Sequence, residues 1–161
     1  MDGKRVKNSE FITSIVTLPE DANMRGNVHG GVIMKHIDNA AAVVASRHAG
    51  CAAVTASIDR LDFHYPVLVG NLITLKAELN MVGRTSMEVG VRVESEDILK
   101  CEVHHIASAY LTFVALNNAG RPTKVPPLIT ETDDEIRRER EGKIRKEVGL
   151  SLKERIFDTI K

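Results

Sequence analysis

The sequence predicts an α+β protein, in which one antiparallel sheet of five or six strands wraps around one long central helix and a charged helical tail follows. Three features of the chain indicate this class: a nearly apolar helical segment, several alternating segments after it, and a densely charged C-terminal stretch. Short connections join the alternating segments, which favours antiparallel pairing. A helix with so few polar groups is mostly buried, so the sheet must cover it.

The first half of the chain contains a strand, a loop and the long helix. Residues 11–18 have the composition of a strand, which Pro19 closes. Residues 19–29 are rich in Asp, Asn and Gly, as is typical of a loop. From Gly31 to about Ala49 the chain is rich in Ala, Met, Ile and Val and lacks proline, which predicts a helix.

Four strands are predicted after the helix. Residues 72–82 alternate between apolar and polar side chains, which indicates a half-buried strand. A turn at 82–85 then predicts a hairpin with the next run. Residues 53–63 and 104–116 are two further strands, and the second is apolar on both faces, which is typical of a central or interface strand. The residues expected to face outward in the hairpin are Thr74, Lys76, Glu78, Asn80, Glu88, Arg92 and Glu94.

The C-terminal quarter leaves the sheet. Residues 117–130 are expected to be extended, and residues 131–148 carry charges of mixed sign that predict an exposed helix. Residues 151–160 predict a second, short amphipathic helix capped by Ser151. The chain is therefore expected to comprise one domain over residues 1–130 and an extension over 131–161. Composition leaves open whether this extension is solvated or contacts another subunit.

Composition excludes several classes of partner. The 161 residues carry 22 basic and 22 acidic side chains, and the basic ones do not cluster as nucleic-acid binding requires. No apolar run approaches the roughly 20 residues that span a bilayer, and the N-terminus has no apolar stretch of a secretory signal. Cys51 and Cys101 have no metal-ligand spacing, so we expect reduced packing residues in a cytoplasmic protein.

The segment from Asn27 to Asp38 is the best candidate for a chemical site. Its loop carries an amide and an imidazole, then two glycines, Gly30 and Gly31, open the helix, and Asp38 follows two turns later. The first turn of a helix presents unpaired N–H groups at its positive end. Such groups can hold an anion, or a carbonyl that becomes one during reaction. The segment therefore predicts an acyl-transfer or hydrolytic site.

Asp38 and Asn27 each have a structural and a catalytic interpretation. A carboxylate on an apolar helix is costly unless it is paired, so Asp38 is either a hydrogen-bonded structural group or a functional one. As a functional group it acts either as a general base toward water or as a nucleophile. Asn27 either orients the water or substrate, or stabilises an Asx turn or a helix cap.

Several further motifs follow one another along the chain in a fixed order. They are Gly26–Gly31, Met34–Asp38, Val54–Asp59, Asp62–His64 with Pro66, Gly83–Glu88, Thr112–Leu116 and Gly120–Arg121. This ordered set resembles the hot-dog-fold acyl-CoA thioesterases of the cytosolic acyl-CoA hydrolase family, and the resemblance runs from about Phe11 to about Glu139. The family includes small bacterial single-domain enzymes and animal enzymes with two fused domains.

This resemblance implies hydrolysis of fatty acyl-CoA to the free acid and coenzyme A, with no cofactor. It implies a double hot-dog homodimer with active sites at the subunit interface, and dimers that often assemble into trimers of dimers. It further implies that Asp38 is the catalytic carboxylate and Asn27 its amide partner. Each site would then pair Asn27 of one subunit with Asp38 of the other.

Further residues complete the predicted site. The Gly31 N–H, beside Gly30, is the candidate oxyanion donor, although the pair also suits simple entry into a helix. His29 is either an auxiliary hydrogen-bonding group or a structural loop residue. Arg84, Thr85 and Ser86 either line the pantetheine channel, with Arg84 on phosphate, or form an ordinary polar turn.

Other chemistries are disfavoured. The neighbours His104 and His105 point to opposite faces of a strand, so no metal site is expected. The chain has no Gly-x-Ser-x-Gly nucleophile motif. The rival hypothesis is a non-catalytic module that binds or senses acyl-CoA, but such a module needs no carboxylate beside the thioester. Hydrolysis on an acyl-carrier protein would require a basic docking surface, which a neutral chain does not suggest.

Overall fold

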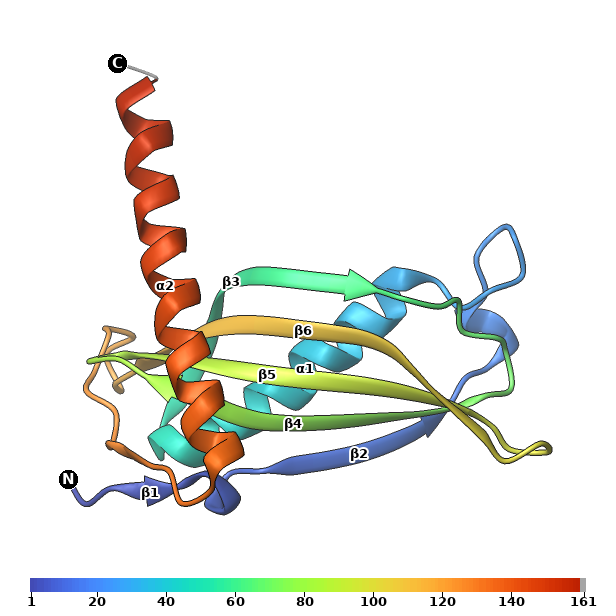
Figure 1. The fold of residues 1–161 in the computed structure, drawn as a ribbon, viewed down its shortest axis with the longest axis horizontal. Coiled ribbons are helices and arrows are strands. Elements are labelled where there is room, and N and C mark those ends of the chain that lie inside the picture. The colour runs from blue at the N-terminus through green and yellow to red at the C-terminus, as the bar shows by residue number, and fades with distance from the viewer. Residues whose placement is uncertain (160–161) are drawn as a thin grey trace.

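A computed structural model describes residues 1–159, and its centre is a five-stranded antiparallel sheet with one long helix on one face (Figure 1). The strand order is β2-β4-β5-β6-β3. The main elements are β2 (Phe11–Val16), α1 (Gly30–Ala49), β3 (Ala52–Phe63), β4 (Leu72–Val82), β5 (Ser86–Asp97), β6 (Glu102–Leu116) and α2 (Asp133–Thr159). The predicted α+β class and five-stranded sheet are thus confirmed.

Short elements that the sequence did not indicate complete the fold. A parallel pair joins β1 (Lys4–Arg5) to β7 (Leu128–Ile129) within the segment that was expected to be merely extended. Two 3₁₀ turns, η1 (Val6–Asn8) and η2 (Pro19–Asp21), flank the first long strand. Two-residue strands and single turns are too short to show a periodic pattern.

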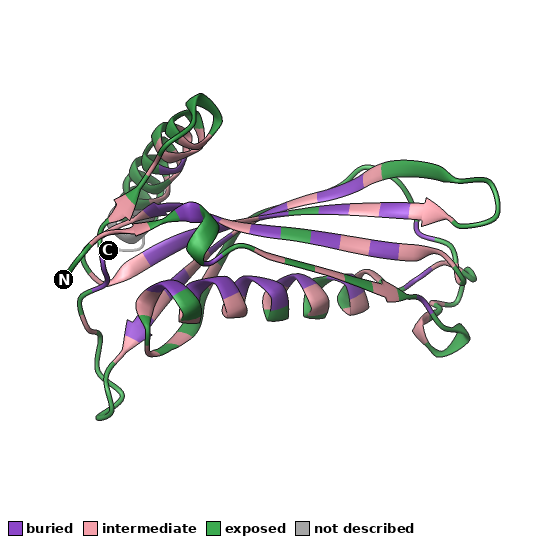
Figure 2. Cartoon of the chain, turned by 90° about the horizontal axis from the view of Figure 1, so that it is seen from below, coloured by how far each residue is buried: buried purple, intermediate pink, exposed green. Residues whose placement is uncertain are grey.

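The long helix buries one face only. Figure 2 shows its buried residues turned toward the sheet and its exposed residues turned away. Met34 on the outer side is 38% exposed, so the chain's own sheet does not enclose the helix as its apolar composition predicted. Gly50 ends the helix in the left-handed conformation, with φ of 69°. The buried face consists of Ile33, Ile37, Ala40, Ala41, Val44, Ala45 and His48.

The predicted bounds of β4 and its hairpin with β5 are confirmed, and the apolar side chains that alternate with the outward ones are all buried. Met81 was predicted to face inward, but a register shift after Leu79 pairs it with Glu88, and it lies against Gly142 of α2. Asn80 and Glu88 lie on the outer face as predicted, but each is only 2% exposed because another element covers that face. The covering element is α2, whose Arg145 contacts the Glu88 carboxylate. A polar residue on the outer face of a strand is therefore buried here by a partner from the far end of the chain.

The two edges of the sheet are β2 and β3, and β6 lies between β5 and β3. The prediction of an interior position for β6 is confirmed, although the middle strand is β5. Among the described residues, β3 pairs with β6 on one side only. Val54 and Ile58 of this edge strand are 46% and 42% exposed. An open edge with exposed apolar side chains is a template for pairing with another chain.

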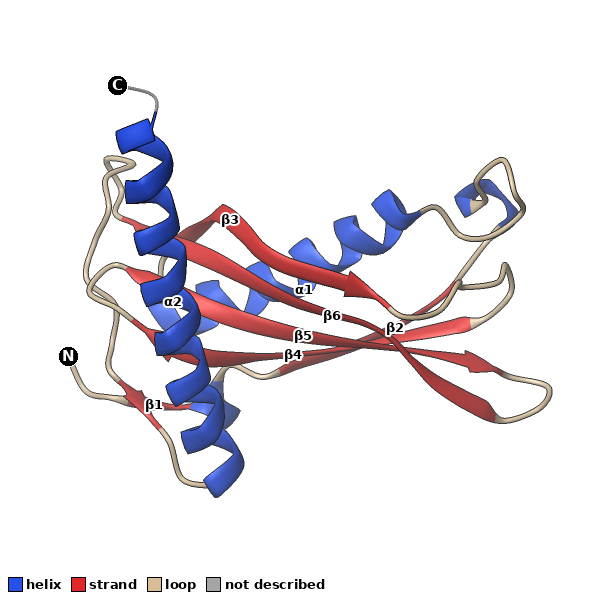
Figure 3. Ribbon diagram, turned by 45° about the horizontal axis from the view of Figure 1, so that its top comes forward, coloured by secondary structure: helices blue, strands red, loops and turns tan. Residues whose placement is uncertain are grey.

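Up to residue 159 the C-terminal segment forms one helix rather than two, and the last residue of the predicted 151–160 helix lies outside the described residues. Ser151 lies inside α2 and caps nothing. The helix begins with a capping box, because the Glu135 N–H donates to Thr132 Oγ1 (3.2 Å) and the Thr132 N–H donates to Glu135 Oε2 (3.1 Å). The helix lies on the sheet face opposite α1 (Figure 3). The division into 1–130 and 131–161 stays a prediction.

Both cysteines are unpaired, as expected. Cys51 is half-buried after α1, but Cys101 is exposed in the β5–β6 turn with φ of 55°, so it is not a packing residue. None of the helices in residues 1–159 combines the length and the apolar character that a membrane span requires.

Candidate active site

A cleft lies at the N-terminus of α1. Two segments form it, the loop before α1 and the chain that follows β3. They are joined where the Val28 N–H donates to the Val67 carbonyl (2.8 Å) and where Asn27 forms a β-bridge with Leu68. The cleft has a volume of about 390 Å³. The residues that line it include Asn23, Asn27, Gly30, Ile33, Phe63, His64 and Tyr65.

The helix start departs from the sequence prediction in one respect. His29 is the N-cap, and its Nδ1 accepts a hydrogen bond from the Gly31 N–H (2.9 Å). The predicted oxyanion donor is therefore already engaged, and His29 has a capping role. Gly30 lines the cleft, and within residues 1–159 no hydrogen bond engages its N–H. At the positive end of the helix, this N–H is the donor that can meet a ligand.

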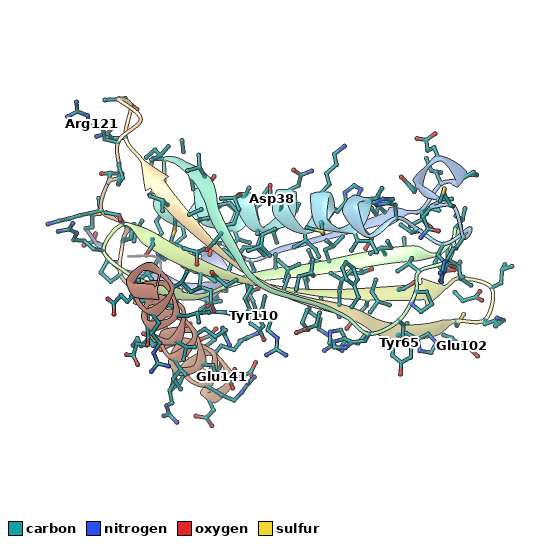
Figure 4. All side chains as sticks on the ribbon, turned by 90° about the horizontal axis from the view of Figure 1, so that it is seen from above. Asp38, Tyr65, Glu102, Tyr110, Arg121 and Glu141 are labelled. Atoms are coloured by element: carbon teal, nitrogen blue, oxygen red, sulfur yellow. The ribbon has the colours of Figure 1, made fainter. Side chains whose placement is uncertain are left out.

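Asp38 is paired with a residue that the sequence did not single out. Its Oδ1 accepts a hydrogen bond from the Thr55 hydroxyl of β3 (2.6 Å). Figure 4 shows Asp38 on the α1 side of the sheet, whereas Tyr110 and Glu141 lie on the α2 side. Asp38 is half-buried, and no other hydrogen bond within the described residues occupies its Oδ2. The carboxylate is thus held by one oxygen while the other can accept a proton.

The chain alone does not bring Asp38 to the cleft. Asp38 follows Gly30 by eight residues, which places it about 12 Å further along the helix axis. Phe63 lies against Gly30 at the far end of β3, whereas Thr55 lies near the start of that strand. Asn27 and Asp38 are therefore separate within one chain.

The residues predicted to bind coenzyme A lie at the opposite end of the sheet from the cleft. Ser86 pairs with Val114 of β6, close to the register position where Ala52 begins β3. Thr85 and Arg84 use their carbonyls to accept hydrogen bonds from the N–H groups of Ala115 (3.0 Å) and Val125 (3.1 Å). The turn thus has a structural role through its backbone. The Arg84 side chain is exposed, and its contact with a phosphate of coenzyme A stays a prediction.

The histidines of β6 hold no metal cluster. His105 Nε2 contacts the Ser108 hydroxyl (2.9 Å), and its ring lies 5.0 Å from that of His64. Among the residues that the structure describes, no three His, Cys, Asp or Glu side chains are grouped as metal ligands would be. The expectation of a site without metal or cofactor stays a prediction.

Sequence comparison identifies relatives over most of the chain. The family described as the thioesterase superfamily matches residues 25–102. Protein VdlD of Helicobacter pylori is 41% identical over 87% of this chain and 80% of its own length. A Bacillus subtilis relative, named as the uncharacterized acyl-CoA thioester hydrolase YkhA, is 37% identical over 81% of this chain and 76% of its own length. The human cytosolic acyl coenzyme A thioester hydrolase is 40% identical over 78% of this chain and 33% of its own length.

Solved structures share the whole architecture. An apo-hexameric acyl-CoA thioesterase is 38% identical, with a TM-score of 0.88 over 91% of this chain and 94% of that one. The Staphylococcus aureus acyl-CoA hydrolase, solved with butyryl coenzyme A and coenzyme A, is 33% identical, with a TM-score of 0.89 over 98% and 96%. Structures also exist of that enzyme with an aspartate, an asparagine or a threonine replaced by alanine. The chain therefore belongs to the thioesterase superfamily, among its hot-dog-fold acyl-CoA thioester hydrolases.

Proposed function

We propose that this enzyme hydrolyses fatty acyl-CoA at active sites that two subunits build together, with Asp38 as the catalytic carboxylate. The observation that carries this proposal is the Asp38–Thr55 hydrogen bond (2.6 Å), which lies at the open edge strand β3 and away from the cleft of the same chain. A substrate must contact both the N-terminus of α1 and the Asp38 carboxylate, but these lie apart within one chain. The N-terminus of α1 from a second subunit must therefore lie beside Asp38.

Pairing along β3 supplies that N-terminus. When two copies of one strand pair antiparallel, the end of each lies beside the start of the other. The Phe63 end of one β3, which lies against Gly30, would then approach the Thr55 end of its partner. A two-fold axis makes the arrangement reciprocal, so a homodimer has two equivalent sites.

The chemistry follows from these groups. Asp38 takes a proton through Oδ2 from a water molecule, whose oxygen attacks the thioester carbonyl carbon. The Gly30 N–H and the positive end of α1 stabilise the oxyanion that forms. The carbon–sulfur bond then breaks, and the coenzyme A sulfur takes the proton from Asp38. Direct attack by Asp38 to form an anhydride is the alternative, and Thr55 would orient the carboxylate in both cases.

Asn23 is a stronger candidate than Asn27 for the amide partner. In the Staphylococcus aureus enzyme the substituted asparagine precedes the substituted aspartate by 15 positions, and the threonine follows the aspartate by 17. Asn23, Asp38 and Thr55 have the same two spacings, whereas Asn27 precedes Asp38 by 11. Both asparagines line the cleft. The Asn23 oxygen accepts from the N–H groups of Arg25 (2.8 Å) and Asn27 (3.3 Å), so its amide nitrogen is the group that can donate to substrate or water.

Side-by-side variants separate the two asparagines. We expect Asn23→Asp, which keeps the oxygen that holds the loop but loses the amide donor, to lower kcat by roughly 10²–10³-fold, as removal of one transition-state donor does. Asn27→Ala is expected to lower kcat by less than about tenfold. Steady-state thiol release measures both. A large loss in Asn27→Ala with little loss in Asn23→Asp would return the role to Asn27.

The activity itself is tested by thiol release from acyl-CoAs of increasing chain length, without added metal. Turnover supports the proposal, and its dependence on chain length reports how deep the acyl channel is. Tight binding of acyl-CoA without turnover would instead favour a ligand-binding module. Turnover that requires added metal would contradict the predicted absence of a metal site.

The relatives support proposals for the oligomeric state and the cellular location of the protein. Because a structurally similar thioesterase is hexameric, we propose that dimers of this chain assemble as a trimer of dimers. The human relative is named as cytosolic, which supports a cytoplasmic location. Arg84, Thr85 and Ser86 remain the proposed contacts for the coenzyme A portion of the substrate.

A further inference from the structure

The C-terminal helix α2 crosses the whole sheet and continues beyond the β3 edge (Figure 1). Its first turns lie over β4, where Arg138 contacts Glu78. Burial raises the pKa of the Glu78 carboxyl, and Arg138 opposes that shift. Its middle lies over β5, where Arg145 contacts Glu88. Gly149 then shares a cavity with Ser57 of β3, the last strand of the sheet. The rest of the helix has passed the edge of its own sheet.

The face of α2 that packs on the sheet continues in register past that edge. Arg138, Gly142, Arg145 and Gly149 line this face, with alternating spacings of four and three residues. Such spacing keeps side chains on one side of a helix. The next positions in the series are Leu152 and Ile156, which are 57% and 50% exposed. The sheet-packing face therefore presents two large apolar side chains where its own sheet has ended.

A second copy of the chain would lie beneath these two residues. Any strand that pairs with β3 extends the sheet under the projecting part of α2. Antiparallel self-pairing of β3 has a two-fold axis normal to the sheet, so both α2 helices lie on the same face and each reaches over its neighbour. The exposed Val54 of β3 lies on this same face, because it pairs with Val114, and Val114 pairs with Ser86 of the cavity beside Gly149. Val54 therefore makes the apolar surface continuous with this region.

We propose that residues 150–156 of α2 form a clasp, in which Leu152 and Ile156 pack on the outer sheet face of a second copy joined along β3. The clasp rests on the dimer of the proposed function and adds a contact on the face opposite the active sites. Its role is to hold the two subunits together, so that the shared active sites persist at low enzyme concentration.

The clasp is tested by subunit exchange between isotope-labelled and unlabelled protein, followed by native mass spectrometry of the full-length chain. We expect the double variant Leu152→Glu/Ile156→Glu to exchange subunits of the dimer roughly tenfold faster or more, because interface changes act mainly on dissociation. The matched control is Glu154→Lys, which changes charge on the opposite side of the same exposed segment. We expect it to exchange at the wild-type rate.

Three results would overturn the clasp: unchanged exchange in the double variant, a wild-type protein that is monomeric at all concentrations, or a variant that merely separates larger assemblies into stable dimers. The last result would place the contact between dimers. Circular dichroism checks that the double variant remains folded, and a second variant that ends at Gly149 must also show the faster exchange. Exchange does not depend on turnover, so a failed hydrolysis assay and a failed clasp are distinguishable.

Discussion

Replacing Asp38 by asparagine is expected to lower kcat for acyl-CoA hydrolysis by roughly 10²–10⁴-fold, the range that a positioned general acid or base contributes. Asparagine keeps an oxygen that can accept the Thr55 hydroxyl hydrogen bond of 2.6 Å, so the link between α1 and β3 survives. It cannot accept the proton of the attacking water, and it cannot attack as a carboxylate. The measurement is steady-state thiol release, with KM determined separately.

Asn39→Ala is the matched control, because Asn39 follows Asp38 on the exposed side of the same helix. We expect its kcat to stay close to that of the wild type. If Asp38→Asn retains turnover within about tenfold of the wild type, Asp38 does not provide the proton transfer that general-base catalysis assigns to it. The structural interpretation of this carboxylate would then be correct.

The second large effect is expected on stability, at the ion pair that anchors α2. The Glu88 side chain is 3% exposed and lies 2.6 Å from Arg145 Nη2. The guanidinium also lies 3.9 Å from the centre of the Tyr110 ring, and Asn80 donates to Glu88 Oε1 (3.0 Å). Replacing Arg145 by methionine leaves a buried carboxylate without its cation. We expect a loss of about 3–5 kcal/mol in the free energy of unfolding.

Urea unfolding at one fixed protein concentration measures this loss, because association of subunits also contributes to apparent stability. Lys143→Met removes the exposed Lys143–Glu139 pair of the same helix and should cost no more than about 1 kcal/mol. The double variant Arg145→Met/Glu88→Gln removes the buried charge as well and should recover part of the loss. An Arg145→Met protein within about 1 kcal/mol of the wild type would show that α2 is anchored by other contacts.

The β4–β5 hairpin could be predicted because most of its side chains alternate between apolar and polar. The bounds of β4 emerge from its alternation alone, since every second residue from Ile73 to Met81 is apolar and buried. The burial of Asn80 and Glu88 on the outer face could not be predicted in this way. Their burial depends on Arg145, which is more than fifty residues away in the chain. Periodicity describes one element and contains no information about its remote partner.

The end of the chain shows how local signals can mislead. Gly149 and Ser151 together resemble the end of one helix and the cap of the next. The structure continues α2 through both. A glycine within a helix costs only about 1 kcal/mol, and the helix-forming residues on either side offset that cost.

The candidate site was predicted in part. The helix start and Asp38 are recognisable because glycines before an apolar helix and a single carboxylate on it are unusual. Thr55 lies in one of the recognised motifs, but its contact with Asp38 joins two different elements. The hydrogen bond from the Gly31 N–H to His29 could not be predicted either, because an imidazole in a loop has several possible partners.

The most direct test of the shared active site is complementation between two inactive variants. Asp38→Asn and Asn23→Asp proteins are unfolded together, refolded as a mixture and assayed for thiol release, with each variant refolded alone as the control. If each site takes Asp38 from one subunit and Asn23 from its partner, every mixed dimer has one intact site, and random pairing restores about a quarter of wild-type activity. Activity that stays at the level of the single variants, in a mixture where native mass spectrometry confirms mixed dimers, would contradict a site built by two subunits.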